Sequence, residues 1–191
     1  MVDLVDNGHT DKNTTHSYLE LYQRVLESKR DLAKNILEIG IGPCKNSNGG
    51  SIKLWHDFFV NAEIHAVDII HKNNVWDKIM NNKRIILHTG TNGYDQKIFD
   101  ERFFSPGIRF DMMLDDGPHT LASMISFIKL YSQVMTDDGV LIIEDVQSYD
   151  WINHLTDATP EHLRKYIKIY DLRPTKNRYD DIVFMIDKLN I

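Results

Sequence analysis

The sequence predicts an α/β protein with a doubly wound, Rossmann-like sheet of seven strands, mostly parallel and ending in a C-terminal antiparallel hairpin. Two observations support this fold class. Short apolar runs alternate with helical stretches through most of the chain, and a connection too short for a crossover helix joins the last two β-type runs. The 191 residues are enough for one core of ordinary size, so we expect residues 1–191 to form a single domain.

The elements follow from periodicity. An amphipathic helix is expected over about residues 13–29, with Thr14 or Thr15 as its N-cap. Five apolar runs typical of parallel strands buried on both faces follow at residues 35–41, 63–69, 84–90, 110–116 and 139–145. Helices are expected between them at residues 51–60, 75–81 and 120–135, the third capped by Thr120. Residues 167–172 and 182–188 form the predicted edge hairpin.

Composition excludes several classes of protein. With 22 Lys and Arg against 28 Asp and Glu, the net charge of −6 argues against a nucleic acid or an anionic membrane as partner. No apolar run approaches the roughly 20 residues that span a bilayer, and the polar, acidic N-terminus differs from a signal peptide. Cys44 is the single cysteine and has no base nearby in the sequence, so we expect neither a disulfide nor a cysteine nucleophile. These features predict a cytoplasmic protein.

A glycine turn follows the first predicted strand, in the sequence Glu38-Ile-Gly40-Ile-Gly42. Its glycines allow a sharp turn that brings backbone N–H groups close to a ligand. A dinucleotide fingerprint would have a third glycine at Lys45, so the spacing favours a ligand without phosphates. The second strand ends at Asp68, whose carboxylate can accept both hydroxyls of a ribose. S-adenosylmethionine is the predicted cofactor; the alternative is that these residues only shape and cap a turn.

Acidic residues follow the fourth and fifth strands, as Asp115-Asp116-Gly117-Pro118-His119 and Glu144-Asp145. Neighbouring strands lie about 4.8 Å apart, so carboxylates at their ends can converge, and like charges that converge require a cation. Oxygen ligands suit Mg²⁺ or another hard divalent cation, and we predict Asp116, Glu144 and Asp145 as its ligands, with Asp115 turned toward the cofactor. His119 is the predicted general base for a hydroxyl. The alternative is an exposed acidic rim beside a solvated histidine.

Three segments carry a resemblance: residues 36–42 with 49–69, residues 110–119 and residues 139–151, which contain the D-D-G-x-H and E-D combinations. They resemble class I S-adenosylmethionine-dependent methyltransferases, in particular the metal-dependent group of macrolide-sugar O-methyltransferases, cephalosporin hydroxylase-like proteins and rhamnosyl O-methyltransferases. Residues 10–22, TDKNTTHSYLELY, resemble the segment that precedes the first strand in that group. The resemblance covers roughly residues 10–150.

The resemblance implies a role for each candidate residue. Glu38, Gly40, Gly42 and Asp68 would bind S-adenosylmethionine, while Asp116, Glu144 and Asp145 would hold Mg²⁺ and His119 would be the base. We count Ser51, Asn92 and Asp115 among the cofactor-binding candidates. The chain departs from the group at Pro118, where a serine is usual, and at Thr91-Asn92, where the group often has Asp-Gln.

The predicted function is Mg²⁺-dependent methyl transfer from S-adenosylmethionine to a hydroxyl of a small sugar-type acceptor, free, nucleotide-linked or glycan-attached. Two alternatives stay open: a catechol-like or other small diol as the acceptor, and a non-catalytic S-adenosylmethionine-binding module. Lys45 argues against an NAD-dependent oxidoreductase, and the acidic charge argues against nucleic acid methylation. A homo-oligomer is left open. We expect the first 17 residues and residues 173–180 to shape the acceptor pocket.

Overall fold

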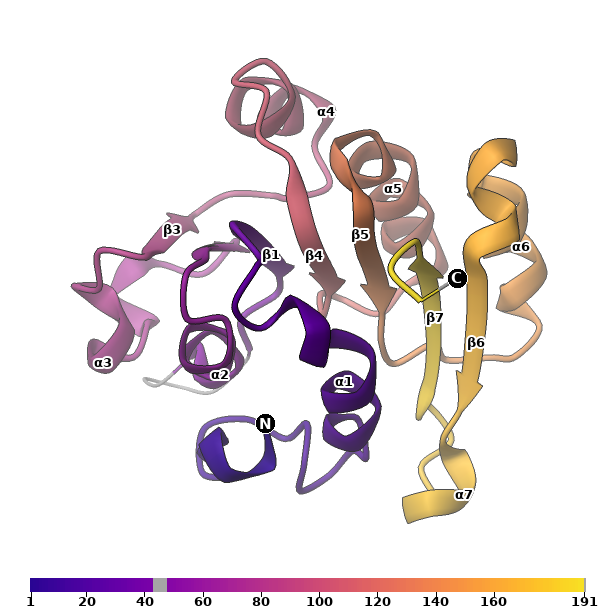
Figure 1. Cartoon of the computed structure of the whole chain (residues 1–191), viewed down its shortest axis with the longest axis horizontal. Coiled ribbons are helices and arrows are strands. Elements are labelled where there is room, and N and C mark those ends of the chain that lie inside the picture. The colour runs from indigo at the N-terminus through magenta and orange to yellow at the C-terminus, as the bar shows by residue number, and fades with distance from the viewer. Residues whose placement is uncertain (43–47, 191) are drawn as a thin grey trace.

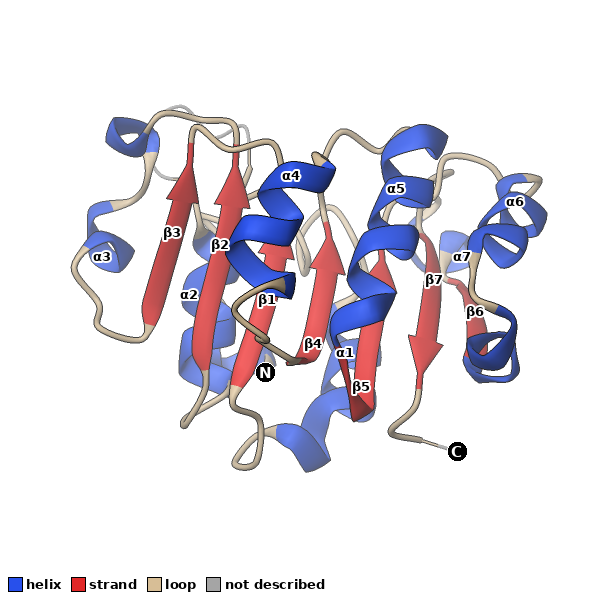
Figure 2. Cartoon of the chain, turned by 90° about the horizontal axis from the view of Figure 1, so that it is seen from above, coloured by secondary structure: helices blue, strands red, loops and turns tan. Residues whose placement is uncertain are grey.

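A computed structural model describes residues 1–42 and 48–190, so the expectations for Cys44 and Lys45 lie outside the described residues (Figure 1). Its strands are β1 (Asn35–Ile39), β2 (Glu63–Asp68), β3 (Ile85–Thr89), β4 (Phe110–Asp115), β5 (Met135–Ile143), β6 (Ile167–Asp171) and β7 (Ile182–Asp187). They form one seven-stranded sheet in the order β3-β2-β1-β4-β5-β7-β6. Strands β1 to β5 are parallel, and β7 runs antiparallel between β5 and β6 (Figure 2). The predicted fold class is confirmed.

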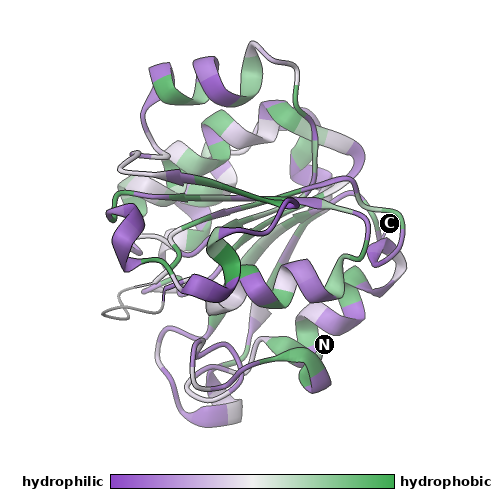
Figure 3. Ribbon diagram, turned by 90° about the vertical axis from the view of Figure 1, so that its left-hand side faces the viewer, coloured by the Kyte–Doolittle hydropathy of each residue, from purple (hydrophilic) through white to green (hydrophobic). Residues whose placement is uncertain are grey.

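Helices cover both faces of the sheet (Figure 3). One face packs against α1 (Leu19–Leu26), α2 (Gly50–Phe58) and α3 (Asp77–Met80). The opposite face packs against α4 (Gln96–Phe99), α5 (Leu121–Tyr131) and α6 (Trp151–Ala158). Successive strand residues alternate between the two cores, as Ile36 and Leu37 do in β1, because side chains of a strand point to opposite faces. Among the described residues, no helix has the length and apolar character needed to cross a membrane.

The N-terminal helix begins later than the periodicity predicts. α1 starts at Leu19 with Tyr18 at its N-cap, so the assignment of Thr14 or Thr15 as the cap was wrong. The carbonyl of Asp11 accepts the N–H groups of both threonines within a turn. The turn exists because residues 10–18 bend toward the ends of the strands, where several of their side chains are bound.

The remaining helical predictions are confirmed in position, with shorter spans, but Met135, the last residue of the helix predicted over 120–135, instead begins β5. Thr120 caps α5 through a capping box with Ser123, as expected from the sequence. Helices α4 and α6 were not predicted. The connection between β6 and β7 holds a single helical turn, α7 (Arg173–Lys176), which is compatible with the predicted hairpin.

The β6–β7 connection also fixes the N-terminal segment. The ammonium of Lys176 donates hydrogen bonds to the backbone carbonyls of Asn13, Thr14 and His16. A segment without regular secondary structure is thereby held beside the carboxyl ends of the central strands.

His65 of β2 gives the fold a pH-dependent weak point. Its ring lies edge-on to Phe110 at 5.3 Å, its Nδ1 is 3.3 Å from Nε2 of His88, and it is 3% exposed. Burial lowers the pKa of His65 from 6.5 to about 4. Between pH 6.5 and about pH 4, His65 is therefore protonated in the unfolded chain but neutral in the folded protein. The free energy of unfolding falls as the pH drops through this range.

We expect His65→Phe to lose less stability on acidification than the wild type. On going from pH 7 to pH 5, the unfolding free energy of the wild type should fall by about 2 kcal/mol because the unfolded chain binds a proton at His65 and the folded protein does not. The variant lacks this group and should not show this loss. Urea unfolding at both pH values measures the difference, and His162→Gln, at an exposed histidine, is the control. An equal loss in the wild type and in His65→Phe would contradict the assignment.

Candidate active site

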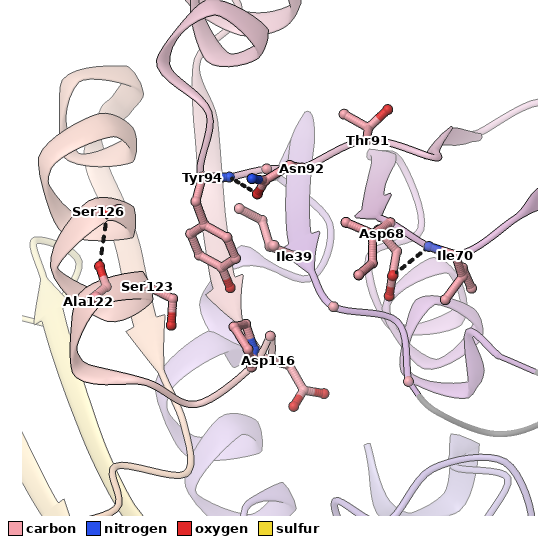
Figure 4. A pocket seen from close by; sticks show the side chains of 16 residues that line it. Ile39, Asp68, Ile70, Thr91, Asn92, Tyr94, Asp116, Ala122, Ser123 and Ser126 are labelled. Atoms are coloured by element: carbon pink, nitrogen blue, oxygen red, sulfur yellow. Dashed lines mark hydrogen bonds between the residues drawn. The ribbon is translucent and has the colours of Figure 1, made fainter.

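A pocket of about 660 Å³ opens at the carboxyl ends of β1, β2 and β4. Its polar lining includes Asp68, Asn92, Tyr94 and Asp116, whose side chains are arranged around it in Figure 4. Ligands of doubly wound sheets bind at this edge, where loops from adjacent strands diverge. The predicted glycine turn also lines the pocket, through Gly40 and Gly42.

The turn after β1 packs directly against the turn after β4. Gly40 has a φ of 84°, and a Cβ atom built on it would lie 1.9 Å from the carbonyl oxygen of Asp116. The N–H of Asp116 donates to the carbonyl of Ile39 at 2.8 Å. Only glycine permits this approach, so Gly40 is required here for both its conformation and its size.

Asp68 is held rigidly where the sequence predicts a ribose contact. Its Oδ2 accepts the N–H of Ile41 at 2.8 Å, and its Oδ1 accepts the N–H of Ile70 at 2.9 Å. These bonds join the end of β2 to the glycine turn. On the next loop, Asn92 is bonded to the N–H of Tyr94 and lines the same pocket.

Three of the predicted cofactor ligands lie outside the pocket lining. Glu38 is fully buried and accepts hydrogen bonds from Ser51 and Trp55, and burial raises its pKa to about 7. Asp115 accepts the hydroxyl of Tyr94, and burial raises its pKa to about 6. Asp115 thereby holds Tyr94, which lines the pocket, while direct contact of Glu38, Ser51 and Asp115 with a cofactor stays a prediction.

Asp116, Asp145 and His119 converge as the sequence predicts, whereas Glu144 is not part of this group. Asp116, His119 and Asp145 each offer one ligand atom, and these three atoms lie within 4.8 Å of one another. Nε2 of His119 is 3.8 Å from Oδ1 of Asp116 and 3.6 Å from Oδ2 of Asp145. These separations exceed a hydrogen bond and leave room for a shared partner. Asp116 also lines the pocket, so the cluster and the pocket share one wall.

Donors from the N-terminal segment occupy the inner side of this cluster. Glu144 accepts a hydrogen bond from Nζ of Lys12 at one carboxylate oxygen and another from the hydroxyl of Tyr22 at the other oxygen. The same ammonium lies 2.7 Å from Oδ2 of Asp116, and the hydroxyl of Tyr18 donates to Asp145. None of these donors was predicted, although all lie in the N-terminal segment that carries part of the resemblance.

A second buried group lies behind Asp145. His16 is 2.6 Å from Asp181 and 3.2 Å from Asp145 through its Nδ1, and Ser17 donates to Asp181 at 2.9 Å. Asp180 joins the group with a ligand atom within 4.8 Å of the others. These contacts fix the N-terminal segment to the start of β7.

The electrostatics of the cluster favour a bound cation. Burial raises the pKa of both Glu144 and Asp145, and the charge of Asp116 raises them further. Burial alone would lower the pKa of the Lys12 ammonium. The nearby negative charges, chiefly those of Asp116 and Glu144, have the larger combined effect and raise this pKa. The oxygen-rich donor set of Asp116 and Asp145 fits a hard divalent ion. Glu144 faces Lys12 and Tyr22, and its predicted role as a metal ligand stays a prediction.

No family model matches the chain. It is 31% identical over 151 residues to mycinamicin VI 2''-O-methyltransferase of Micromonospora griseorubida, a match that covers 76% of this chain and 35% of that protein. It is 28% identical to L-olivosyl-oleandolide 3-O-methyltransferase of Streptomyces antibioticus, over 71% of this chain and 34% of that protein. The chain thus spans about a third of the length of these curated relatives.

The fold agrees with the same group. The solved structure of the MycE methyltransferase from the mycinamycin biosynthetic pathway, in complex with Mg and SAH, superposes with a TM-score of 0.70 at 22% identity. The match covers 91% of this chain and 50% of that one. The resemblance inferred from the sequence is confirmed: homologues of this chain are sugar O-methyltransferases, and it has the fold of an S-adenosylmethionine-dependent methyltransferase.

The contact between Gly40 and Asp116 predicts a steric requirement. Gly40→Ala should lower the unfolding free energy by about 3 kcal/mol, because a buried backbone contact must open. Gly90→Ala is the matched control: Gly90 has a φ of 63° but no atom within 4 Å of a built Cβ, so only backbone strain of about 1 kcal/mol applies. Denaturant unfolding of both variants checks this; equal losses would show that the contact carries no cost of its own.

Proposed function

We propose that this homologue of the sugar O-methyltransferases is itself an S-adenosylmethionine-dependent O-methyltransferase, which methylates a hydroxyl of a sugar-type acceptor with the help of a divalent cation. One observation carries the proposal: Asp116 belongs both to the lining of the pocket and to the cluster with His119 and Asp145. A cofactor in the pocket and an acceptor at the cluster would therefore meet.

The pocket supports the cofactor assignment. Asp68 offers a fixed carboxylate for the ribose hydroxyls, while Gly40 and Gly42 allow the chain to approach the ligand closely. The remaining lining is largely apolar, including Ile39, Ile69 and Ile70, as suits the faces of an adenine ring. The bound cofactor would supply the electrophilic methyl group.

The cluster supports metal assistance. Asp116 and Asp145 would hold Mg²⁺ or another hard divalent ion, with Glu144 a further predicted ligand, and a bound ion lowers the pKa of a hydroxyl that it coordinates. His119 lies beside both aspartates and is 31% exposed at its side chain, so it can receive the acceptor proton and release it to solvent. The methyl group would pass from the sulfur of the bound cofactor to the acceptor oxygen, leaving S-adenosylhomocysteine, and the protein would contribute mainly by orienting the two reactants.

The acceptor class rests on the relatives: the printed names describe 2''-O-methylation of mycinamicin VI and 3-O-methylation of L-olivosyl-oleandolide, whose olivosyl group is a sugar. A sugar offers adjacent hydroxyls that can meet the cation and His119 together. A catechol-like or other small diol shares this chemistry, so acceptor profiling separates the two classes.

The first test is calorimetric titration with S-adenosylhomocysteine, with NAD⁺ as the control ligand. We expect binding of the homocysteine ligand alone, and Asp68→Asn should weaken it at least about tenfold, because a carboxylate bonded to ribose hydroxyls is lost. Preference for NAD⁺, or no binding of either ligand, would overturn the cofactor assignment.

The second test addresses the base. With Mg²⁺, labelled S-adenosylmethionine and a panel of sugar glycosides, nucleotide sugars and catechols, His119→Ala should lower kcat at least about 100-fold while leaving S-adenosylhomocysteine binding nearly unchanged. His154→Ala, at an exposed histidine outside the cluster, is the matched control. Near-normal turnover by His119→Ala would remove the base role. Methylation of catechols but not of sugars would replace the acceptor class.

A further inference from the structure

Lys12 is a buried cation at the point where the acidic residues that follow β4 and β5 meet. Its side chain is 1% exposed, its ammonium lies 2.7 Å from Oδ2 of Asp116, and it is bonded to Oε1 of Glu144. Burying an ammonium is costly unless carboxylates compensate it, so Lys12 and these two acids form one electrostatic unit.

The position of Lys12 is fixed rather than incidental. The carbonyl of Lys12 accepts the N–H of Tyr18 at 3.1 Å, and the hydroxyls of Tyr18 and Tyr22 bind Asp145 and Glu144. Lys176 holds the intervening backbone from the other side. The ammonium therefore faces the carboxylates as part of an anchored segment.

The two sides of Asp116 face different partners. Oδ2 is bonded to Lys12, whereas Oδ1 faces His119 at 3.8 Å. Asp145 likewise directs Oδ2 toward His119 and Oδ1 toward Tyr18. A divalent cation would thus find Oδ1 of Asp116 and Oδ2 of Asp145 on the side of His119, with Lys12 on the far side.

We propose that Lys12 competes with the divalent cation for the carboxylates of Asp116 and Glu144. It thereby weakens metal binding when neither cofactor nor acceptor is bound. The inference rests on the proposed function, because the competing ion is the one proposed there. Two effects act together: the ammonium occupies an oxygen of Glu144 that a metal would use, and its positive charge on Oδ2 of Asp116 repels a divalent ion held on the opposite oxygen of that carboxylate. Glu144 becomes available as a ligand only when the ammonium withdraws from it.

A purely structural role for Lys12 makes the opposite prediction. If the ammonium only held Asp116 and Glu144 in place for the metal, its removal would disorder the ligands and weaken binding. The sign of the change in metal affinity therefore separates competition from support.

The test is Mn²⁺ titration of the full chain, with free Mn²⁺ counted by electron paramagnetic resonance and neither cofactor nor acceptor present. Lys12→Met keeps the length of the side chain and removes its charge, so Kd for Mn²⁺ should fall at least about tenfold. Tyr22→Phe is the matched control, because it removes the other donor to Glu144 without changing the charge; its Kd should change at most about fivefold. Unchanged or weaker binding by Lys12→Met would overturn the proposal.

A second measurement keeps the proposal testable if Lys12→Met folds poorly without metal. Lys12→Gln keeps a polar group at the site, and its thermal unfolding midpoint should rise more with added Mn²⁺ than that of the wild type, because tighter binding stabilises the folded state more. An equal or smaller rise would reject competition. If neither the wild type nor the lysine variants bind Mn²⁺, the metal site of the proposed function fails as well, whereas binding of unchanged affinity refutes only the competition.

Discussion

The site is governed by the need to neutralise buried carboxylates at the carboxyl edge of the sheet. Glu38 lies near the end of β1, Asp116 follows β4, and Glu144 and Asp145 follow β5, and all four have little contact with solvent. Lys12 supplies a positive charge in their midst. Removing Lys12 would leave buried carboxylates uncompensated at a cost of several kcal/mol, so its position ties the N-terminal segment to this edge of the sheet.

Strand order explains why these residues meet. β4 lies between β1 and β5, and Asp115 is in register with Ile39 on one side and with Ile143 on the other. The next residues along the three strands are Gly40, Asp116 and Glu144, which therefore begin the adjacent loops. Asp116 belongs both to the pocket beside the glycine turn and to the acidic cluster, so a ligand in the pocket and a cation at the acids would share this residue.

The sequence predicts most of this arrangement because most of it is local. Apolar runs mark the strands, and residues at their ends, such as Asp68 and Asp116, must lie at one edge of a parallel sheet. Lys12 could not be predicted by periodicity, since its partners are 104 and 132 residues away. Tyr18 and Tyr22 lie within the helix predicted over residues 13–29, but that prediction gives no hint that their buried hydroxyls bind Asp145 and Glu144. The available signal was the resemblance of residues 10–22 to a segment of known methyltransferases.

Backbone geometry, more than side-chain identity, limits what the site tolerates. His119 and Asp145 both adopt left-handed conformations, with φ of 50° and 54°, at a cost of order 1 kcal/mol each. This conformation turns both side chains toward Asp116 instead of continuing the direction of the strands. Gly117 completes the constraint, because a Cβ atom there would lie 1.9 Å from the hydroxyl of Tyr94. The loop from Asp116 to His119 must therefore pass close to Tyr94 and still bring the imidazole back to the carboxylates, so an insertion there would separate His119 from Asp116 and Asp145.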